Sequence, residues 1–522
     1  MNSTGLQYKW KVLIVAIFGT FMAILDATAV NVALNQLRLY FNADIVAVGW
    51  VVTAYTLALG IVTPVAGYGS DAWGIKRLYM MSLLVFVVGS LLCGIAPTLP
   101  VLVAARVLQG LGAGALSPLS LALLLSAFPR EQRGLAFGIF GMPLVVAPAL
   151  GPVLGGYLVE YLDWRYIFWV NLPVGLLGIV LAWRWLVESQ RISSTKPDVI
   201  GLGLSAIGFS SVLYAASEVS NRGWTDPLVL SALGLGALAL AVFAIHELRA
   251  PDPIVDLRLF SRPVFTLASL VGWVSVLALF GAEFLMPLYL QGLRGLKPFE
   301  TGLLLLPLAI ASGIVAPIAG VLYDRFGARP LLVPGFALIM LNTWQLSQIK
   351  LDTSLWDIGV ILAIRGLGLG LIIQPTLNAA LSVVSGRAVR RATSLVNASR
   401  QVFLSLGVAV LASVLQSHIS TPPTPISFVR GFEDAYLVTF WAAVASFCLS
   451  LFVPGWPGRY QPPTEGRAVP VTAPASAEEH HAPSTGVVGS VVGPLPGHSY
   501  GYGHAPWHPA LTAYDALTTA RL

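Results

Sequence analysis

The sequence predicts an all-α integral membrane protein with fourteen transmembrane helices. Hydrophobic residues make up 56% of the 522 positions and charged residues only 10%. Soluble globular chains carry about 25% charged residues, so a surface this poor in charge cannot face water on all sides. Apolar runs of about 20 residues, the length that crosses a hydrocarbon core, recur along most of the chain.

The fourteen runs follow one another with short polar connections. They cover residues 12–34, 46–67, 78–97, 101–127, 134–160, 166–187, 199–217, 228–248, 264–290, 301–323, 329–348, 356–383, 393–417 and 434–455. The first run is longer than the apolar core of a signal peptide, and no small-residue cleavage pattern follows it. We therefore expect this run to be retained as the first helix.

Basic residues are distributed unequally between the two sets of loops. With the N-terminus placed in the cytoplasm, 20 Lys and Arg residues fall on that side and 7 on the other. The remaining three, Arg106, Arg365 and Arg400, fall inside apolar runs. Because cytoplasmic loops are enriched in positive charge, this bias predicts cytoplasmic termini. We expect a multi-pass protein of a bacterial inner membrane, surrounded by the lipid bilayer.

The composition changes at about residue 456. Pro, Gly, Ser, Thr and His dominate from there to residue 522, and the hydrophobic periodicity ends. This predicts a disordered cytoplasmic tail. Five of the seven histidines lie in it, at a spacing that matches no defined metal site. The two cysteines, Cys93 and Cys448, lie in apolar runs and are expected to be small core residues, so we predict no metal site.

Two predicted cytoplasmic loops share one pattern of Gly, Asp, Gly and basic residues. They read 67-GYGSDAWGIKR-77 and 320-GVLYDRFGAR-329, which are offset by 253 residues. A second echo joins 106-RVLQGLGAG-114 to 365-RGLGLG-370. Duplicated halves are typical of transporters. We therefore predict a six-helix bundle at 1–190, two inserted linker helices at 191–250, a second six-helix bundle at 251–455 and the tail at 456–522.

Several motifs together resemble the major facilitator superfamily, in its fourteen-helix drug:proton antiporter branch of the EmrB/QacA type. They are 25-LDATAVNVAL-34, the 67–77 loop, 106-RVLQGLGAG-114, 147-APALGPVLGG-156 and 163-DWRYIFWVNLPVG-175. The resemblance covers about residues 10–455 and implies the major facilitator fold. The chain departs from the branch at Asn35, where Pro is usual, and at Val402 and Phe403, where small residues usually follow Arg-Gln.

Asp26 and Arg106 are expected to meet inside the membrane. At 1.5 Å per residue, Asp26 lies about 21 Å from the cytoplasmic side and Arg106 about 9 Å from the outer side. In a core of about 30 Å these depths nearly coincide, and a lone charge there costs several kcal/mol. We predict a pair that faces a central cavity, with Asp26 taking up the coupling proton that the resemblance implies. The alternative is an ion pair that only fixes two helices together.

The runs contain other candidate residues. Glu283 lies at a similar distance before Asp324 in the sequence as Asp26 does before Asp71. It is therefore a candidate second proton or cation site, and the alternative is a carboxylate that reaches water. Arg365 and Arg400 have three alternative roles: they neutralise the charge of these acids, contact an anionic substrate or donate hydrogen bonds to backbone carbonyls. Tyr55 is a candidate wall of the substrate cavity, although aromatic residues in membrane helices more often pack.

The resemblance implies that the repeated loops latch the cytoplasmic side during alternating access. Their glycines permit tight turns, and their acids can sit at helix N-termini. The alternative for the basic residues of these loops is that they only set the orientation of the chain in the membrane. The gate residues are Gly67, Asp71, Gly74, Lys76, Arg77, Asp324, Arg325, Gly327 and Arg329.

The run 141-GMPLVVAPALGPVLGG-156 places small residues and proline inside a helix. Gly151, Pro152, Gly155 and Gly156 are expected to bend the fifth helix and to let a neighbour approach closely. The resemblance implies that this motif marks exchangers, and ordinary helix packing is compatible with that.

The sequence predicts a proton-coupled efflux antiporter for amphipathic or cationic drugs, which is not an enzyme. No Walker loop, GxSxG or HExxH motif is present. We therefore expect the proton gradient to be the energy source, and we expect no cofactor. The first alternative is an exporter or importer of one metabolite, such as an amino acid, siderophore or natural product. The second is a receptor using this fold. The partners expected are small-molecule substrate and protons, with a periplasmic adaptor subunit as an optional partner and no nucleic acid.

Overall fold

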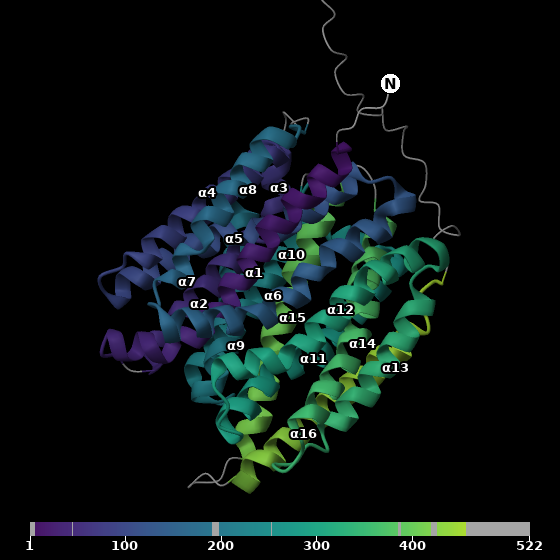
Figure 1. The fold of residues 1–522 in the computed structure, drawn as a ribbon. Coiled ribbons are helices and arrows are strands. Elements are labelled where there is room, and N and C mark those ends of the chain that lie inside the picture. Colours follow the sequence, from purple (N-terminus) through teal and green to yellow (C-terminus); the bar gives the residue numbers. More distant parts are fainter. Residues whose placement is uncertain are drawn as a thin grey trace, which may run out of the picture. The chain divides into compact units, whose positions relative to one another are not determined.

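Helices make up the regular structure of the residues that the computed structural model describes, which are 6–43, 45–189, 198–251, 253–384, 388–418 and 425–455 (Figure 1). The first bundle contains α1 (Tyr8–Tyr40), α2 (Ile45–Val62), α3 (Ala66–Trp73), α4 (Ile75–Gly94), α5 (Leu99–Ala127), η1 (Arg130–Gln132), α6 (Arg133–Tyr161), α7 (Tyr166–Trp169) and α8 (Asn171–Trp185). Then come α9 (Val199–Arg222), α10 (Pro227–Arg249) and η2 (Leu257–Ser261). The second bundle contains α11 (Pro263–Leu288), η3 (Tyr289–Leu293), α12 (Pro298–Phe326), α13 (Arg329–Leu346), α14 (Leu355–Ser382), α15 (Ala388–His418) and α16 (Pro425–Ser450).

Two groups of helices pack mainly among themselves. In the first, α1 packs along α5, α6 and α8, while α5 also lies against α2 and α4. In the second, α14 packs along α11, α12 and α13, and α16 along α11 and α13. Helices α9 and α10 pack on each other, and α9 also contacts α2 and α15. Contacts divide the chain after Gly466, and the predicted tail at 456–522 lies outside the described residues. The predicted bundle boundaries stay predictions.

The predicted apolar runs coincide with helices, but fewer helices meet the full requirements of a membrane span. Among the described residues, eleven are long and apolar enough, or twelve if the bent pair α2 and α3 counts as one span. Helix α13 has the required 18 residues but is not among them, and α11 is counted only as the shorter apolar stretch Pro263–Leu279 of its described residues. Fourteen spans are therefore only partly confirmed. The bend of 54° between α2 and α3, at residues 63–65, was not predicted.

Local sequence explains where the inserted helices begin and end. Asp226 accepts hydrogen bonds from the backbone N–H groups of Leu228 and Val229, and Pro227 occupies the first turn of α10. Asp198 caps α9 in the same way through Gly201, and Gly223 ends α9 with a positive φ of 84°. A capping acid, an early proline and a terminal glycine are the usual signals of helix boundaries.

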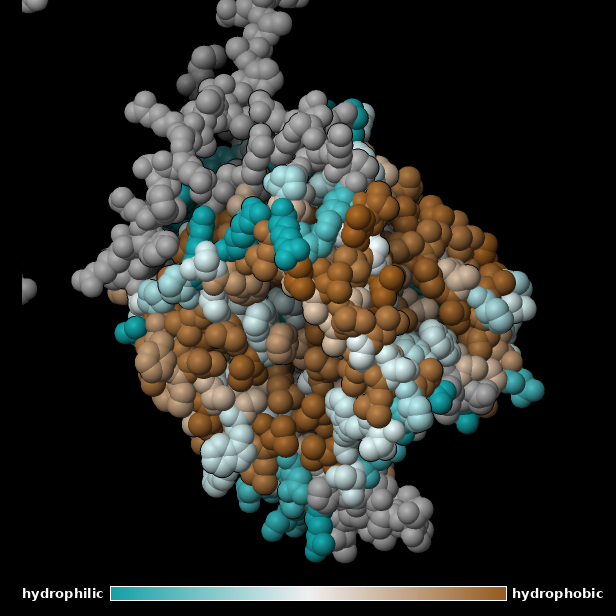
Figure 2. Space-filling model, turned by 180° about the vertical axis from the view of Figure 1, so that it is seen from behind, coloured by the Kyte–Doolittle hydropathy of each residue, from teal (hydrophilic) through white to brown (hydrophobic). Residues whose placement is uncertain are grey.

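The surface of the described part is apolar over a broad middle band. Figure 2 shows hydrophobic residues across the middle of this face and hydrophilic residues gathered toward its two ends. Large side chains point outward, including Trp183 at 65% exposure, Ile314 at 61% and Trp441 at 66%. An exposed apolar surface of this extent is expected to face lipid, because water does not hydrate apolar side chains favourably.

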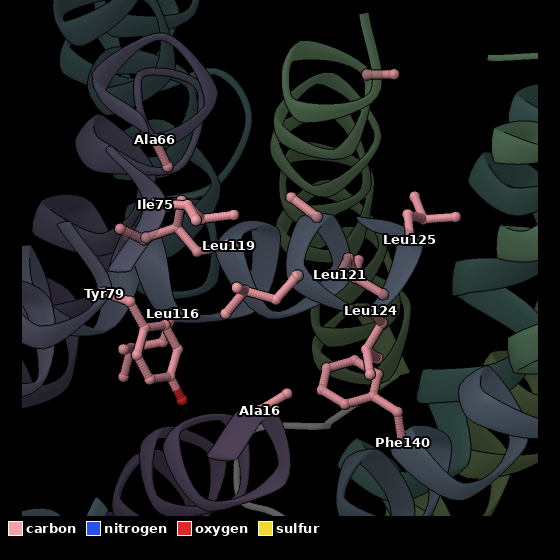
Figure 3. Packing of buried hydrophobic residues seen from close by; sticks show 14 of the residues in the cluster. Ala16, Ala66, Ile75, Tyr79, Leu116, Leu119, Leu121, Leu124, Leu125 and Phe140 are labelled. Atoms are coloured by element: carbon pink, nitrogen blue, oxygen red, sulfur yellow. The ribbon is translucent and has the colours of Figure 1, made fainter. Parts of the chain in front are cut away.

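The core of the first bundle is formed where α1, α4, α5 and α6 meet. Figure 3 shows Tyr79 of α4 and Leu116 of α5 pointing toward Ala16 of α1, with Phe140 of α6 near Leu124. The Tyr79 hydroxyl donates to the carbonyl of Val15 at 2.7 Å. A buried hydroxyl without a partner would be costly in this apolar setting, so this bond fixes α4 against α1.

Candidate functional site

A buried ion pair joins α1 to α5. The Arg106 Nη1 atom lies 2.6 Å from the Asp26 Oδ2 atom, and both side chains are fully enclosed. The structure therefore brings together the two charges that the depth estimate placed at one level. A short, charge-assisted contact of this kind compensates two groups that would be very costly alone in lipid.

Two amides complete the shell around the carboxylate. Gln109 Nε2 donates to Asp26 Oδ1 at 2.9 Å, and Asn171 Nδ2 donates to the same oxygen at 2.7 Å. Both amides also donate to Ser90 Oγ at 3.1 Å. Residues of α1, α4, α5 and α8 thus form one polar network, which we call the Asp26 network. Sequence reasoning missed its amides, although Gln109 lies one helical turn beyond Arg106 on α5 and so on the same face.

The guanidinium of Arg106 is held on its other sides by α2. Its Nε donates to the carbonyl of Val51 at 3.0 Å, and its Cζ lies 4.1 Å from the centre of the Tyr55 ring. Tyr55 is 3% exposed, and its hydroxyl donates to the carbonyl of Ala23. Tyr55 therefore packs on Arg106 through a cation–π contact. It lines neither of the two described pockets, and its role at a substrate cavity stays a prediction.

The described pockets lie away from the Asp26 network. One is bounded by α11, α14 and α15, with a free volume of about 460 Å³ that includes its open mouth. The other is bounded by α2, α9 and α15, with about 580 Å³ counted in the same way. Asp26 lines neither of them and is only 1% exposed. The expectation that Asp26 faces a cavity is not met in this conformation, because four helices close around its carboxylate.

Arg365 occupies the matching position in the second bundle but makes different contacts. Its Nη2 donates to the carbonyls of Ala278 and Leu279 at 2.8 and 2.6 Å, and its Nη1 to Asn342 Oδ1 at 3.2 Å. Leu279 follows Asp26 by 253 residues, which is the offset of the repeat. Of the alternatives for Arg365, the described contacts favour bonding to backbone carbonyls. The side chain of Glu283 lies outside the described residues, so its role stays a prediction.

The first repeated loop joins the two bundles through Asp71 at the end of α3. The buried Asp71 carboxylate lies 2.5 Å from Arg390 Nε and 3.4 Å from Arg391 Nε, both on the first turn of α15. One turn earlier, the backbone N–H of Gly67 donates to Ser394 Oγ at 2.8 Å. We call these contacts the Asp71 latch. The sequence identified Asp71 and Gly67 as gate residues but not their partners on α15.

The second repeated loop makes an equivalent contact at the start of α6. Asp324, at the end of α12, accepts hydrogen bonds from the backbone N–H groups of Gly134 and Leu135 at 2.7 and 3.0 Å. These are unpaired donors of the first helical turn, where the helix dipole also favours a negative charge. We call this contact the Asp324 latch. It has the arrangement expected for an acid at a helix N-terminus.

The remaining gate residues shape the two loops. Gly74 and Gly327 have positive φ values of 91° and 80°, which favour glycine. Lys76 Nζ donates to the carbonyl of Trp183, and Arg329 Nε donates to that of Val453. The other two gate arginines, Arg77 and Arg325, are exposed.

An acid that the sequence did not single out caps α4. Glu188 accepts hydrogen bonds from the backbone N–H groups of Lys76 and Arg77 at 3.1 and 3.2 Å. Its Oε2 also lies 3.7 Å from Arg77 Nε. Because Arg77 is well exposed, we expect the cap to matter more than this surface pair.

Weakening the Asp324 latch is expected to open this end of the molecule. Asp324→Asn removes the charge that two backbone donors share, which costs about 1.5–3 kcal/mol and shifts the closed-to-open ratio by roughly 10- to 150-fold. Spin labels on the exposed positions Arg130 and Phe326 would report the separation of α6 and α12. A longer distance component should appear in the variant. The matched change Asp357→Asn, at an exposed carboxylate in the first turn of α14, should leave the distances unchanged. Unchanged distances in Asp324→Asn would show that the latch does not stabilise the closed conformation.

The α6 motif packs directly against α1. A Cβ atom on Gly155 would lie 2.8 Å from the carbonyl oxygen of Ala29, and one on Gly151 would lie 2.0 Å from Thr28 Oγ1. Gly156 is buried, and Pro152 lies inside the helix together with Pro143 and Pro148. Small residues therefore let α1 and α6 approach at backbone distance, as predicted for this motif.

Gly155→Val is expected to push α6 away from α1. The obstacle is backbone, which cannot rotate aside, so we expect a loss of about 1–3 kcal/mol of stability. Thermal unfolding of the purified protein would measure it. Gly234→Val on α10 is the matched control, since a Cβ at Gly234 meets nothing within 4 Å. Equal unfolding midpoints for the two variants would contradict the close packing of α1 and α6.

Comparison with known proteins agrees with this architecture. Residues 16–408 match the family model described as Major Facilitator Superfamily. The chain is 35% identical over 447 residues to the uncharacterized MFS-type transporter YhcA of Bacillus subtilis, covering 85% of this chain and 84% of that one. It is 34% identical over 426 residues to the multidrug resistance protein Stp of Mycobacterium tuberculosis, covering 81% and 78%.

The fold matches solved transporters as well. The proton:xylose symporter XylE aligns with a TM-score of 0.62 and 15% identity, over 86% of this chain and 96% of that one. At this identity the likeness shows the fold alone. The apolar helices, the fold and the matches over most of the chain give one conclusion. This chain is a multi-pass membrane transporter, rather than an enzyme, and belongs to the major facilitator superfamily.

Proposed function

We propose that this protein is a proton-coupled antiporter that exports amphipathic compounds by alternating access. The observation that carries the proposal is the Asp26 network, a carboxylate at membrane depth that receives donors from three side chains on two other helices. Relatives at 29–35% identity include proteins named for lincomycin and multidrug resistance. The energy source is the proton gradient, with no bound cofactor.

The Asp26 network supplies a way to link protonation to conformation. Arg106, Gln109 and Asn171 all donate to the carboxylate, and these bonds are strongest to its charged form, so a proton added there weakens them. A movement of α1 relative to α5 or α8 would separate these donors from the carboxylate. The carboxylate could then bind a proton in their place. Protonation and helix movement then favour one another, which is the coupling that an exchanger needs.

The two latches fit the same cycle. They close the seam between the bundles at the end where α1 begins, which the charge bias assigns to the cytoplasm. A conformation closed there can release substrate outward, and breaking the latches would admit substrate from inside. In this proposal the chain lies in a bacterial inner membrane with both termini cytoplasmic, where a periplasmic adaptor subunit is an optional partner.

Gradient-driven accumulation in inverted vesicles tests the proposal. Vesicles containing the protein should accumulate rhodamine 123 or fluorescein when respiration acidifies their interior, and a protonophore should abolish this. Vesicles from cells lacking the protein are the control. Accumulation that survives the protonophore would refute proton coupling, and accumulation of neither dye would refute export of amphipathic compounds of this size.

A further inference from the structure

The inserted helix α9 closes a gap between the two bundles that neither the Asp26 network nor the latches use. Helix α9 packs against α2 of the first bundle and α15 of the second (Figure 1). The rings of Trp50 on α2 and Tyr214 on α9 stack with their centroids 5.9 Å apart. Just beyond the end of α9, Trp224 Nε1 donates to Ser413 Oγ on α15 at 2.8 Å. The pocket of about 580 Å³ lies between these three helices, and we call it the α9 pocket.

The wall of the α9 pocket is uncharged among the described residues. Its polar side chains are Thr53, Thr56, Ser217, Gln401 and Ser405. The apolar part of the wall includes Leu57, Leu213, Leu404 and Val408. The charged neighbours of these residues in the sequence do not line it: Glu218 lies 2.9 Å from Arg222 Nε. Arg400 lines the pocket bounded by α11, α14 and α15, where its role stays a prediction.

Two side chains of α15 present polar groups to the α9 pocket. Gln401 and Ser405 lie four positions apart, and so on one face of the helix. Both are half-buried, and neither side chain is hydrogen-bonded to another residue of the described part of the chain. Gln401 follows Ala388, the first residue of α15, by thirteen positions, which is roughly 20 Å along the helix axis. A carboxamide at that depth in a core about 30 Å thick is costly without a hydrogen bond, which favours a ligand that supplies one.

The other polar side chains of the wall already have partners. Thr53 Oγ1 and Ser217 Oγ lie 3.0 Å apart and join α2 to α9, while Thr56 Oγ1 donates to the carbonyl of Val52 at 3.0 Å. Polar recognition therefore falls to α15. A charged group in the α9 pocket would lose its hydration and meet no opposite charge among the described wall residues. The α9 pocket thus fits an uncharged group that both donates and accepts hydrogen bonds, such as an amide or a hydroxyl.

We propose that the α9 pocket is a subsite for an uncharged, hydrogen-bonding group of an amphipathic substrate. The Gln401 carboxamide donates to that group and accepts from it, and Leu57, Leu213 and Val408 contact the apolar part beside it. Helix α9 supplies one wall of the subsite, which gives the inserted helices a part in substrate selection. The inference rests on the proposed export function and names the substrate chemistry for it.

Three derivatives of one fluorophore test the subsite. Dansylglycinamide carries an uncharged amide, dansylglycine methyl ester replaces that amide by an uncharged group without N–H donors, and dansylglycine carries a carboxylate at neutral pH. Fluorescence anisotropy would measure the binding of each to purified protein, with protein-free micelles subtracted.

Two variants change the α9 pocket, and each has a matched control. Gln401→Leu removes the carboxamide, and Ala216→Leu places a larger side chain in the pocket from α9. The control for the first is Gln36→Leu, at an exposed glutamine of α1. The control for the second is Gly203→Leu, on the same helix, where a Cβ atom meets nothing within 4 Å. The unfolding midpoint of each variant shows whether it is folded.

The expected pattern separates recognition by Gln401 from general packing. Wild type should bind the amide about 3- to 10-fold more tightly than the ester, because the ester offers no N–H donor. The carboxylate should bind at least about tenfold more weakly than the ester, because its charge would be buried without a partner. Gln401→Leu should bind the amide and the ester equally, and Ala216→Leu should weaken the binding of both. The two control variants should match wild type.

Other results would overturn the subsite. Carboxylate binding as tight as amide binding, binding of none of the three compounds, or an amide preference that survives Gln401→Leu each contradicts it. Unchanged binding in a folded Ala216→Leu variant would place the compounds outside the α9 pocket, and if that variant does not fold, the comparison with Gln401→Leu still decides. Because binding needs no gradient, amide-selective binding without gradient-driven accumulation of dye would refute the proposed function and keep the subsite. Gradient-driven accumulation without amide selectivity would do the reverse.

Discussion

Replacing Asp26 by Asn should abolish gradient-driven accumulation of substrate in inverted vesicles, with a drop of at least about tenfold. The amide keeps the shape of the side chain but cannot exchange a proton at working pH. Without that exchange, the movement of α1 against α5 and α8 is no longer linked to the gradient. Counterflow, in which labelled substrate exchanges for unlabelled substrate without a gradient, should remain.

Counterflow is the readout that separates coupling from damage, because Asp26→Asn also leaves Arg106 without its counter-charge. A variant that folds but cannot couple retains counterflow, whereas a misfolded one loses both activities. Asp357→Asn, which changes an exposed carboxylate of α14, should behave as wild type in both assays. Full gradient-driven accumulation by Asp26→Asn would make Asp26 structural and would transfer the coupling role to Glu283.

Replacing Arg106 by Leu should have the largest effect on stability. The change leaves the Asp26 carboxylate buried without its cation, and breaking a buried ion pair from one side costs about 3–5 kcal/mol. It also removes the bond to the Val51 carbonyl and the contact with Tyr55, both of which hold α2 against α5. The unfolding midpoint of the purified protein should fall well below that of wild type.

The double variant Asp26→Asn/Arg106→Leu tests whether charge is the cause. Removing both charges of a buried pair is often nearly neutral, so much of the lost stability should return. Gln109 and Asn171 can still donate to the carbonyl oxygen of the amide that replaces the carboxylate. If the double variant is as unstable as the sum of the two single ones, the loss comes from packing around Arg106 rather than from an uncompensated charge.

Several features of the site were predictable because they depend on position along a helix. The depth of a residue follows from its distance to the nearest helix end, and this was enough to place Asp26 and Arg106 at one level. The repeated loops, with their Gly and Asp spacing, likewise indicated where the bundles contact each other. The left-handed conformations of Gly74 and Gly327 follow from the same turn pattern.

Rotation of the helices about their axes was not predictable in the same way. Most of these helices are apolar on nearly all sides, so hydrophobic pattern does not identify which face meets which neighbour. For this reason Asp26 and Tyr55 were expected at a cavity wall, whereas the structure encloses both. The amides of Gln109 and Asn171 and the α15 arginines of the Asp71 latch were missed on the same grounds.

The amino-acid sequence by itself determined the class of this protein, its apolar helices, its duplicated halves and the depth of its buried charges. These properties depend on composition and on distance along the chain, which a bilayer of known thickness converts into position. Only the tertiary structure decided which buried charges are enclosed by their neighbours and which line a pocket. Contacts among α1, α5 and α8 enclose Asp26, and contacts among α11, α14 and α15 leave Arg400 at a cavity, because side chains far apart in sequence meet only when helices pack.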